Sequence, residues 1–136
     1  MTWDEIVESI RPELEGMHAA RERALKESRA LIQVCSKCIR HVHRKQFDEA
    51  RALLAQARQM ADESRASASA HPEILHAGYL QDAEKEMVEA AAVLAMSLDE
   101  PLPDVRELRV SIPSYLNGMG EAASEARRFL LDEMRA

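Results

Sequence analysis

The sequence predicts an all-α protein, an antiparallel bundle of long amphipathic helices. Three observations lead to this prediction. Aromatic residues make up 4% of the 136 residues and apolar residues 46%. Glycine and proline are few, whereas Ala, Leu, Glu, Arg and Met, which favour helices, recur throughout. No stretch places β-branched or aromatic residues at every second position. A chain of this length can bury one core, so we expect a single domain over residues 1–136.

The first helix is predicted to begin at the N-terminal end of the sequence, where Thr2 and Glu5 have the spacing of a capping box. Pro12 is expected to bend or restart it. Apolar residues then recur at helical spacing through residues 14–42, a stretch of roughly 45 Å at 1.5 Å per residue. Cys35 and Cys38 belong to this pattern, so we expect buried, reduced thiols rather than metal ligands.

Three further helices are predicted after the first. Residues 45–48 interrupt the apolar pattern, which indicates a tight turn before an antiparallel second helix with apolar positions from Ala50 onward. The Ala- and Ser-rich residues 61–70 are expected to fray its end. The third helix is predicted from Pro72 to near Leu98, and a loop follows at residues 99–104. Residues 108–110 are too short for a strand, and Pro113 opens the fourth helix.

Charge is distributed unevenly along the chain, which carries a formal net charge of -6. Residues 21–58 contain ten Lys and Arg against four acidic residues, whereas residues 82–136 contain six against twelve. Basic and acidic functions are therefore expected in different parts of one molecule. Charged residues interrupt every long apolar stretch and the chain begins with an acidic segment. We therefore expect neither a membrane span nor a signal peptide, no membrane partner, and a cytoplasmic location.

Two pairs of glutamates are candidates for metal chemistry. Glu86 and Glu89 are three residues apart and Glu121 and Glu125 four apart, so each pair shares one face of a helix. Carboxylates from two facing helices repel one another unless a hard cation such as Mg²⁺, Mn²⁺ or Ca²⁺ lies between them. Such an arrangement is suited to phosphodiester hydrolysis. On spacing alone, glutamates three or four residues apart are usually a solvated helix face.

Three segments together resemble the translin family. Residues 22–44 read ERALKESRALIQVCSKCIRHVHR, residues 85–90 read KEMVEA, and residues 115–128 read YLNGMGEAASEARR. The last two are similar to the family's Gln-Glu-Tyr-Val-Glu-Ala motif and to its Tyr-Leu-Leu-Gly motif, which runs into an acid, three residues and Glu-Leu-x-Arg. The resemblance extends from about Arg21 and is to an archaeal- or bacterial-type single-chain member. It implies a translin-like fold and a homo-oligomer that forms a shell.

The resemblance also implies a site. Family members similar to translin-associated factor X cleave single-stranded RNA with metal-binding carboxylates. By position, these fall on Glu86, Glu89 and Glu121 as catalytic ligands of Mg²⁺ or Mn²⁺, with Glu125 as a fourth catalytic member or an orienting group. Two positions depart from the nuclease type, because Glu121 stands in place of Asp and Met87 in place of Tyr. The family commonly continues into further C-terminal helices, whereas this sequence ends at Ala136, so we expect a domain without them.

The basic stretch is expected to supply contacts to RNA phosphates, which position a strand without reading its sequence. The RNA-binding candidates are Arg29, Lys37, Arg40, His43, Arg44 and Lys45. Three functions stay open: a metal-dependent endoribonuclease acting on single-stranded RNA, a non-catalytic module that binds RNA or single-stranded DNA, and a helical assembly protein with no nucleic-acid role. A carboxylate-bridged oxidase is disfavoured, because neither Glu86 nor Glu121 has a His three residues later.

Overall fold

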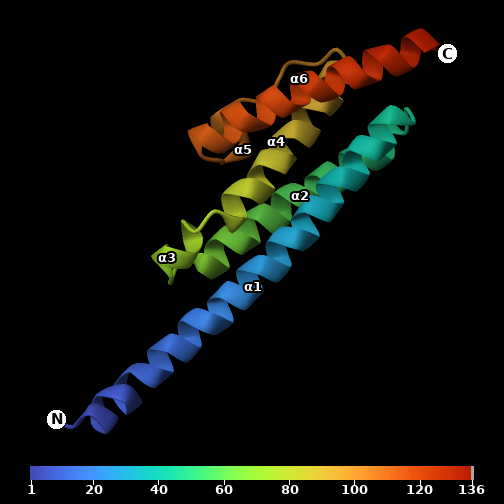
Figure 1. The fold of residues 1–136 in the computed structure, drawn as a ribbon. Helices are drawn as coiled ribbons and strands as arrows, with labels where there is room; N and C mark the ends of the chain where they lie inside the picture. Colours follow the sequence, from blue (N-terminus) through green and yellow to red (C-terminus); the bar gives the residue numbers. More distant parts are fainter. Residues whose placement is uncertain (136) are drawn as a thin grey trace.

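The computed structural model describes residues 1–135, and every regular element in that range is a helix (Figure 1). The helices are α1 (Trp3–His43), α2 (Phe47–Ala68), α3 (Pro72–Leu75), α4 (Tyr79–Ser97), α5 (Val105–Leu108) and α6 (Ile112–Arg135). The all-α prediction is therefore confirmed. Among the described helices, none combines the length and the apolar character needed to cross a membrane.

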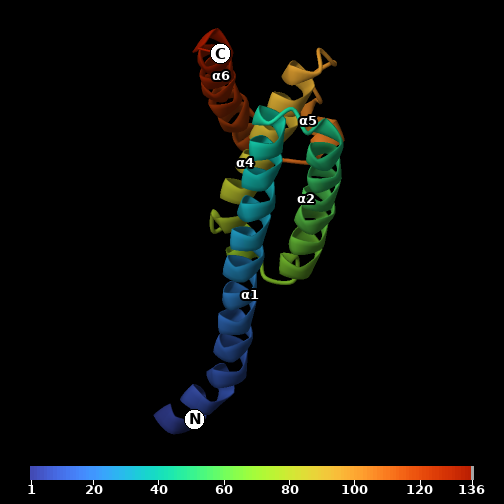
Figure 2. The same cartoon turned by 90° about the vertical axis from the view of Figure 1, so that its right-hand side faces the viewer.

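Helix α1 is a single helix of 41 residues. Its start has both bonds of the predicted capping box, because the Thr2 amide donates to the Glu5 carboxylate (2.8 Å) and the Glu5 amide donates to the Thr2 hydroxyl (3.2 Å). Pro12 lies inside the helix, so the alternative that the helix restarts there is wrong. A proline in the first turns of so long a helix removes one backbone bond without ending it. The first turns only lean away from the main axis (Figure 2).

The predicted turn between α1 and α2 occupies residues 44–46, with Lys45 in the left-handed region (φ 59°). Helix α2 packs along α1 and continues to Ala68. The prediction that its end frays was wrong. Ala61, Ser64 and Ala68 are buried, because their small side chains let the helix lie close to its neighbours. An Ala/Ser run therefore forms a packed helix end here.

The predicted third helix is in fact two helices. Gly78 has φ +105°, a conformation that residues with a Cβ rarely adopt, and it separates α3 from α4. The Gln81 side chain holds this break together: it accepts from the Gly78 amide (3.1 Å) and donates to the Leu75 carbonyl (2.8 Å). A continuous helix from Pro72 was therefore an incorrect prediction.

Helix α4 lies at the centre of the molecule and contacts α1, α2 and α6. It is buried on most sides, and its residues 90–95 are apolar all round, as expected of a central helix. Its buried side chains include Ala83, Met87, Val88, Ala90, Ala91, Ala92, Val93 and Leu94. The thiols of Cys35 and Cys38 are free and buried in the same core, as predicted. Burial raises the pKa of Cys35 to about 12 and that of Cys38 to about 11.

The connection between α4 and α6 contains the predicted loop and one helix that was not predicted. Asp104 caps α5 by accepting from the amides of Arg106 (2.9 Å) and Glu107 (2.8 Å). The Tyr115 hydroxyl donates to the Pro103 carbonyl (2.9 Å) and so fixes the loop against the start of α6. Helix α6 then crosses α4 (Figure 1), and Glu121 of α6 thereby comes close to Glu86 and Glu89 of α4.

Candidate metal centre

Three of the predicted glutamates converge. One carboxylate oxygen from each of Glu86, Glu89 and Glu121 lies within 4.8 Å of the other two. Glu86 and Glu89 come from successive turns of α4, and Glu121 reaches them from α6. Glu89 is buried, whereas Glu86 and Glu121 are half-buried. Glu121 reaches the cluster although it is one methylene longer than the Asp of the nuclease-type family members.

The cluster is electrostatically strained without a cation. Burial and, after it, the neighbouring Glu121 and Glu86 together raise the pKa of Glu89 to about 8. Burial would also raise the pKa of Glu121, but hydrogen bonds from Lys85 and Glu89 outweigh it and lower that pKa. The metal-free protein therefore carries one protonated and one ionised carboxyl side by side at neutral pH.

Lys85 is the cation next to this cluster. Its Nζ lies 3.0 Å from a carboxylate oxygen of Glu121 and 3.9 Å from one of Glu86. The bond to Glu121 raises the pKa of the Lys85 ammonium despite its partial desolvation. The charge of the three glutamates is thus partly compensated by a residue of α4 itself.

Glu125 does not join the three glutamates. Its carboxylate instead accepts from Nε2 of His43 on α1 (2.6 Å) and lies 3.8 Å from Arg128. The other ring nitrogen of His43, Nδ1, is buried and has no hydrogen-bond partner among residues 1–135. This geometry fits a ring whose Nε2–H is donated to Glu125, and it ties the C-terminal end of α1 to α6.

Carboxylates and basic residues meet in one cavity of about 270 Å³. Glu86, Glu89 and Glu125 contribute the acidic lining. Arg40 from α1 and Arg128 from α6 contribute the positive charge. The remaining lining residues are Ser36, Ile39 and His43. Among the described residues Arg40 has no ion pair, and Arg128 has only the long contact to Glu125, so both guanidinium groups can meet an anion that enters the cavity.

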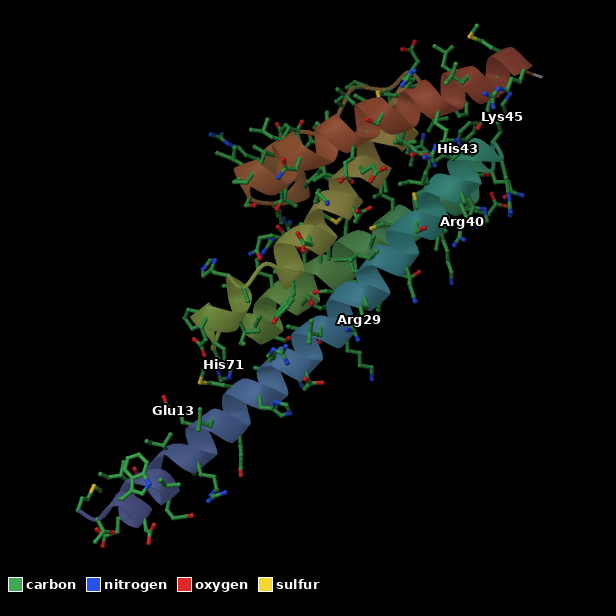
Figure 3. The ribbon with its side chains drawn as sticks, viewed as in Figure 1. Glu13, Arg29, Arg40, His43, Lys45 and His71 are labelled. Atoms are coloured by element: carbon green, nitrogen blue, oxygen red, sulfur yellow. The ribbon has the colours of Figure 1, made fainter. Side chains whose placement is uncertain are left out.

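Two of the six predicted RNA-binding residues line this cavity, and the other four lie elsewhere. Arg40 and His43 line the cavity beside the glutamates. Lys45, in the turn after α1, instead pairs with Glu133 of α6 (3.2 Å), and Figure 3 shows it with His43 at the α6 end of α1. Arg29 lies farther along α1, about 20 Å from His43 at 1.5 Å per residue. Lys37 and Arg44 are exposed.

The donor set of the cluster fits a hard divalent cation. All three groups offer oxygen atoms, and Mg²⁺ and Mn²⁺ prefer oxygen ligands. Burial, and after it the neighbouring carboxylates, keep Glu89 protonated, and a cation between the carboxylates would favour its ionised form. Next to Glu121, the ammonium group of Lys85 already supplies part of the positive charge that such a cation would bring.

Two residues of this region were missed by the sequence reasoning. Lys85 directly precedes Glu86, but only the crossing of α4 and α6 shows that its partner is Glu121. Arg128 follows Glu125 by three residues in the motif of α6, a spacing that places both on one face of the helix. That spacing was a readable signal for Arg128. No comparable signal existed for Lys85.

No protein-family model matches the sequence. An uncharacterized protein of Methanocaldococcus jannaschii is 28% identical over 124 residues, which are 90% of this chain and 54% of that protein. The chain thus spans about half the length of this curated relative.

Two crystal structures are similar in fold. The apo-NeC3PO structure matches with a TM-score of 0.85 at 19% identity, over 98% of this chain and 70% of that one. The AfC3PO structure matches with a TM-score of 0.82 at 31% identity, over 93% and 65% respectively. The chain therefore has the translin-type fold of the C3PO structures, which is the fold that the resemblance of its helix sequences implied.

Proposed function

We propose that this chain is a nucleic-acid-binding protein of translin type that cleaves single-stranded RNA with the help of Mg²⁺ or Mn²⁺. The observation that carries the proposal is the convergence of Glu86, Glu89 and Glu121 beside a cavity that also contains Arg40 and Arg128. The translin-type fold supports nucleic-acid binding. The chain covers 54% of its curated relative and 65% of the AfC3PO chain. Its activity, substrate and oligomeric assembly are therefore all part of the proposal.

The chain's own residues have distinct tasks in this proposal. Glu86, Glu89 and Glu121 hold the cation, which when bound neutralises charge on the phosphate and lowers the pKa of an attacking water. Arg40 and Arg128 bind the phosphate at the cavity and orient it toward the glutamates. His43 and Glu125 fix the α1 end of the cavity through their hydrogen bond. The exposed Lys37 and Arg44 bind neighbouring phosphates of the strand.

A second function, RNA or single-stranded DNA binding without cleavage, is favoured by one observation. Lys85 already gives Glu121 a positive partner, so the cluster has some charge compensation without a metal ion. In that case the cavity would bind a phosphate group of the nucleic acid without cleaving the strand. The two functions predict the same binding and differ in turnover.

Incubation of labelled single-stranded RNA with the protein separates the two functions. We expect cleavage in Mg²⁺ or Mn²⁺ that stops in EDTA. Glu89→Gln keeps the size of the side chain but removes the charge that holds the cation, so turnover should be lost while RNA binding persists. Glu125→Gln should lower turnover less, because Glu125 lies outside the cluster. Binding without cleavage by the wild type in either metal would exclude the nuclease and leave the binding module.

Gel shifts at low and moderate salt test the binding itself. Reversing the charge of Arg40 and Arg44 should weaken RNA binding and reduce its dependence on salt, since each neutralised phosphate contributes to that slope. An unchanged slope would place RNA on another surface. A wild-type protein that binds neither RNA nor single-stranded DNA at low salt would contradict both functions.

A further inference from the structure

Lys85 occupies a particular place in the candidate metal centre. Its ammonium group lies between Glu121 of α6 (3.0 Å) and Glu86 of α4 (3.9 Å), and its side chain is only 27% exposed. Among the described residues one other Lys forms an ion pair, Lys45 with Glu133, and its side chain is 59% exposed. Lys85 is therefore held against two of the three carboxylates that would bind a metal ion.

A bound cation and this ammonium group compete for the same charge. A divalent ion between Glu86, Glu89 and Glu121 would lie within a few ångströms of Nζ, and like charges at that separation repel strongly in a partly buried site. One of the two must therefore give way. The ammonium can do so because it sits at the end of a flexible chain of four methylenes.

The structure offers Lys85 a second position. Asp82 lies three residues earlier on the same helix, so the two share a face, and its carboxylate attracts the Lys85 ammonium. A hollow of about 560 Å³ opens beside them and is lined by Asp82, Asn117, Glu121 and Ser124, among others. An ammonium released from Glu121 can turn into this hollow and keep polar partners there.

We propose that Lys85 is a built-in counter-ion that a divalent cation has to displace from Glu121, and that it thereby sets the affinity of the site for metal. This inference rests on the proposed function, since it concerns the same glutamates. It adds a residue that tunes the metal site, and it predicts that the site binds metal more weakly than its three carboxylates alone would. Lys85 acts through Glu121 and Glu86, so it is a positioning residue.

Calorimetric titration with Mn²⁺ alone, without RNA, tests the proposal. Lys85→Gln and Lys85→Met remove the charge, so both should bind Mn²⁺ roughly tenfold more tightly than the wild type. Lys85→Arg keeps the charge and should bind no more tightly. Lys26→Gln is the matched control, because Lys26 is exposed on α1 and the net charge changes equally. It should leave the affinity unchanged.

Thermal unfolding gives a second readout that is independent of activity. In EDTA, Lys85→Gln should melt below the wild type, since the carboxylates lose their counter-ion. Its melting temperature should also rise more when Mn²⁺ is added. If Lys85→Met folds poorly, Lys85→Gln and Lys85→Arg still form the comparison between absence and presence of charge.

The outcomes distinguish this inference from the proposed function. Glu89→Gln should abolish Mn²⁺ binding. If it does, while Lys85→Gln binds Mn²⁺ no more tightly than the wild type, Lys85 is only a structural partner of Glu121 and the inference is overturned. The metal site would then stand. If neither the wild type nor Lys85→Gln binds Mn²⁺, the metal site itself is absent, and the nuclease function fails together with the inference.

Discussion

A single buried carboxyl, Glu89, links the stability of this protein to the chemistry proposed for it. The side chain is buried between α4 and α6 with two other carboxylates as neighbours. Burial and these neighbours raise its pKa from the ordinary 4.5 to about 8. In the metal-free protein the group therefore holds its proton at neutral pH, and any ligand that needs the ionised carboxylate has to displace that proton.

The first prediction concerns the pH dependence of stability in EDTA. A raised pKa in the folded state stabilises the protein fully below about pH 4.5, and this contribution is lost as the pH rises through about 8. The lowered pKa of Glu121 acts only at the acid end, where its contribution is lost as the pH falls. Between pH 5 and 8 we therefore expect the melting temperature of the wild type to drop by about 5 °C or more relative to that of Glu89→Gln.

Scanning calorimetry across this range checks the prediction. The variant Glu63→Gln is the control, because Glu63 is exposed on α2 and, within the described part of the chain, accepts a hydrogen bond from Gln59 alone. It should keep the wild-type slope. Equal slopes for the wild type and Glu89→Gln would mean that Glu89 is ionised in the folded protein at neutral pH.

The individual residues of the site were predictable to different degrees. The spacing of the glutamates on two helices, together with the translin resemblance, led to Glu86, Glu89 and Glu121 without a structure. Their convergence, the pairing of Glu125 with His43 and the contact of Lys85 with Glu121 depend on where α1, α4 and α6 cross. Periodicity along one helix contains no information about such a crossing.

At the scale of elements, the close approach of α4 and α6 determines the site. Gly118 of α6 faces α4, where a Cβ would lie 2.6 Å from the Cβ of Val88 and 2.7 Å from the carbonyl oxygen of Lys85. Ala122, one turn later, is buried in the same contact. These small residues let α6 lie near enough to α4 for Glu121 to reach Glu86 and Glu89.

The second prediction is that Gly118→Ala destabilises the protein by about 2 kcal/mol, because backbone as well as a side chain of α4 obstructs the new methyl group. Moving α6 outward would also separate Glu121 from α4, so Mn²⁺ binding should weaken. Chemical denaturation and Mn²⁺ titration measure the two effects. Gly120→Ala meets no atom within 4 Å and replaces a helical glycine, so it should stabilise by up to about 1 kcal/mol. If Gly118→Ala is as stable as the wild type, α4 and α6 do not pack as closely as described.

The helices were predicted well where apolar residues recur at helical spacing over a long stretch. They were predicted poorly where a few residues determine whether a helix breaks or ends. Long helices in the regions of α1, α2, α4 and α6 followed from the spacing of apolar side chains. The break at Gly78 was missed, because one glycine within a periodic stretch does not reveal a positive φ. The Ala/Ser-rich end of α2 was judged to fray from its composition, whereas burial against neighbouring helices stabilises it.

At the scale of the whole molecule, the N-terminal part of α1 stands apart from the bundle. Figures 1 and 2 both show its first turns projecting beyond α2, α4 and α6. This segment carries exposed apolar side chains, among them Trp3 (73% exposed) and Leu14 (57%). A hollow of about 490 Å³ runs along it, lined by Val7, Ile10, Arg11, Leu14, Glu15 and His18. An isolated helix with so large an apolar face is seldom stable in water.

The last prediction is that copies of this chain associate through the projecting part of α1. Neither the bundle nor another described segment covers Ile10 and Leu14. A second copy of the chain is available wherever the protein is made, so we expect it to cover these side chains. Light scattering at micromolar concentration should give a mass above that of the 15.3 kDa chain. The pair Ile10→Glu and Leu14→Glu places charge in the contact and should shift the mass toward the monomer while the bundle stays folded. Leu102→Glu alters another exposed leucine, 47% exposed in the loop before α5, and should leave the mass unchanged. A monomeric wild type would contradict the prediction and leave the metal cluster, which lies within one chain, unaffected.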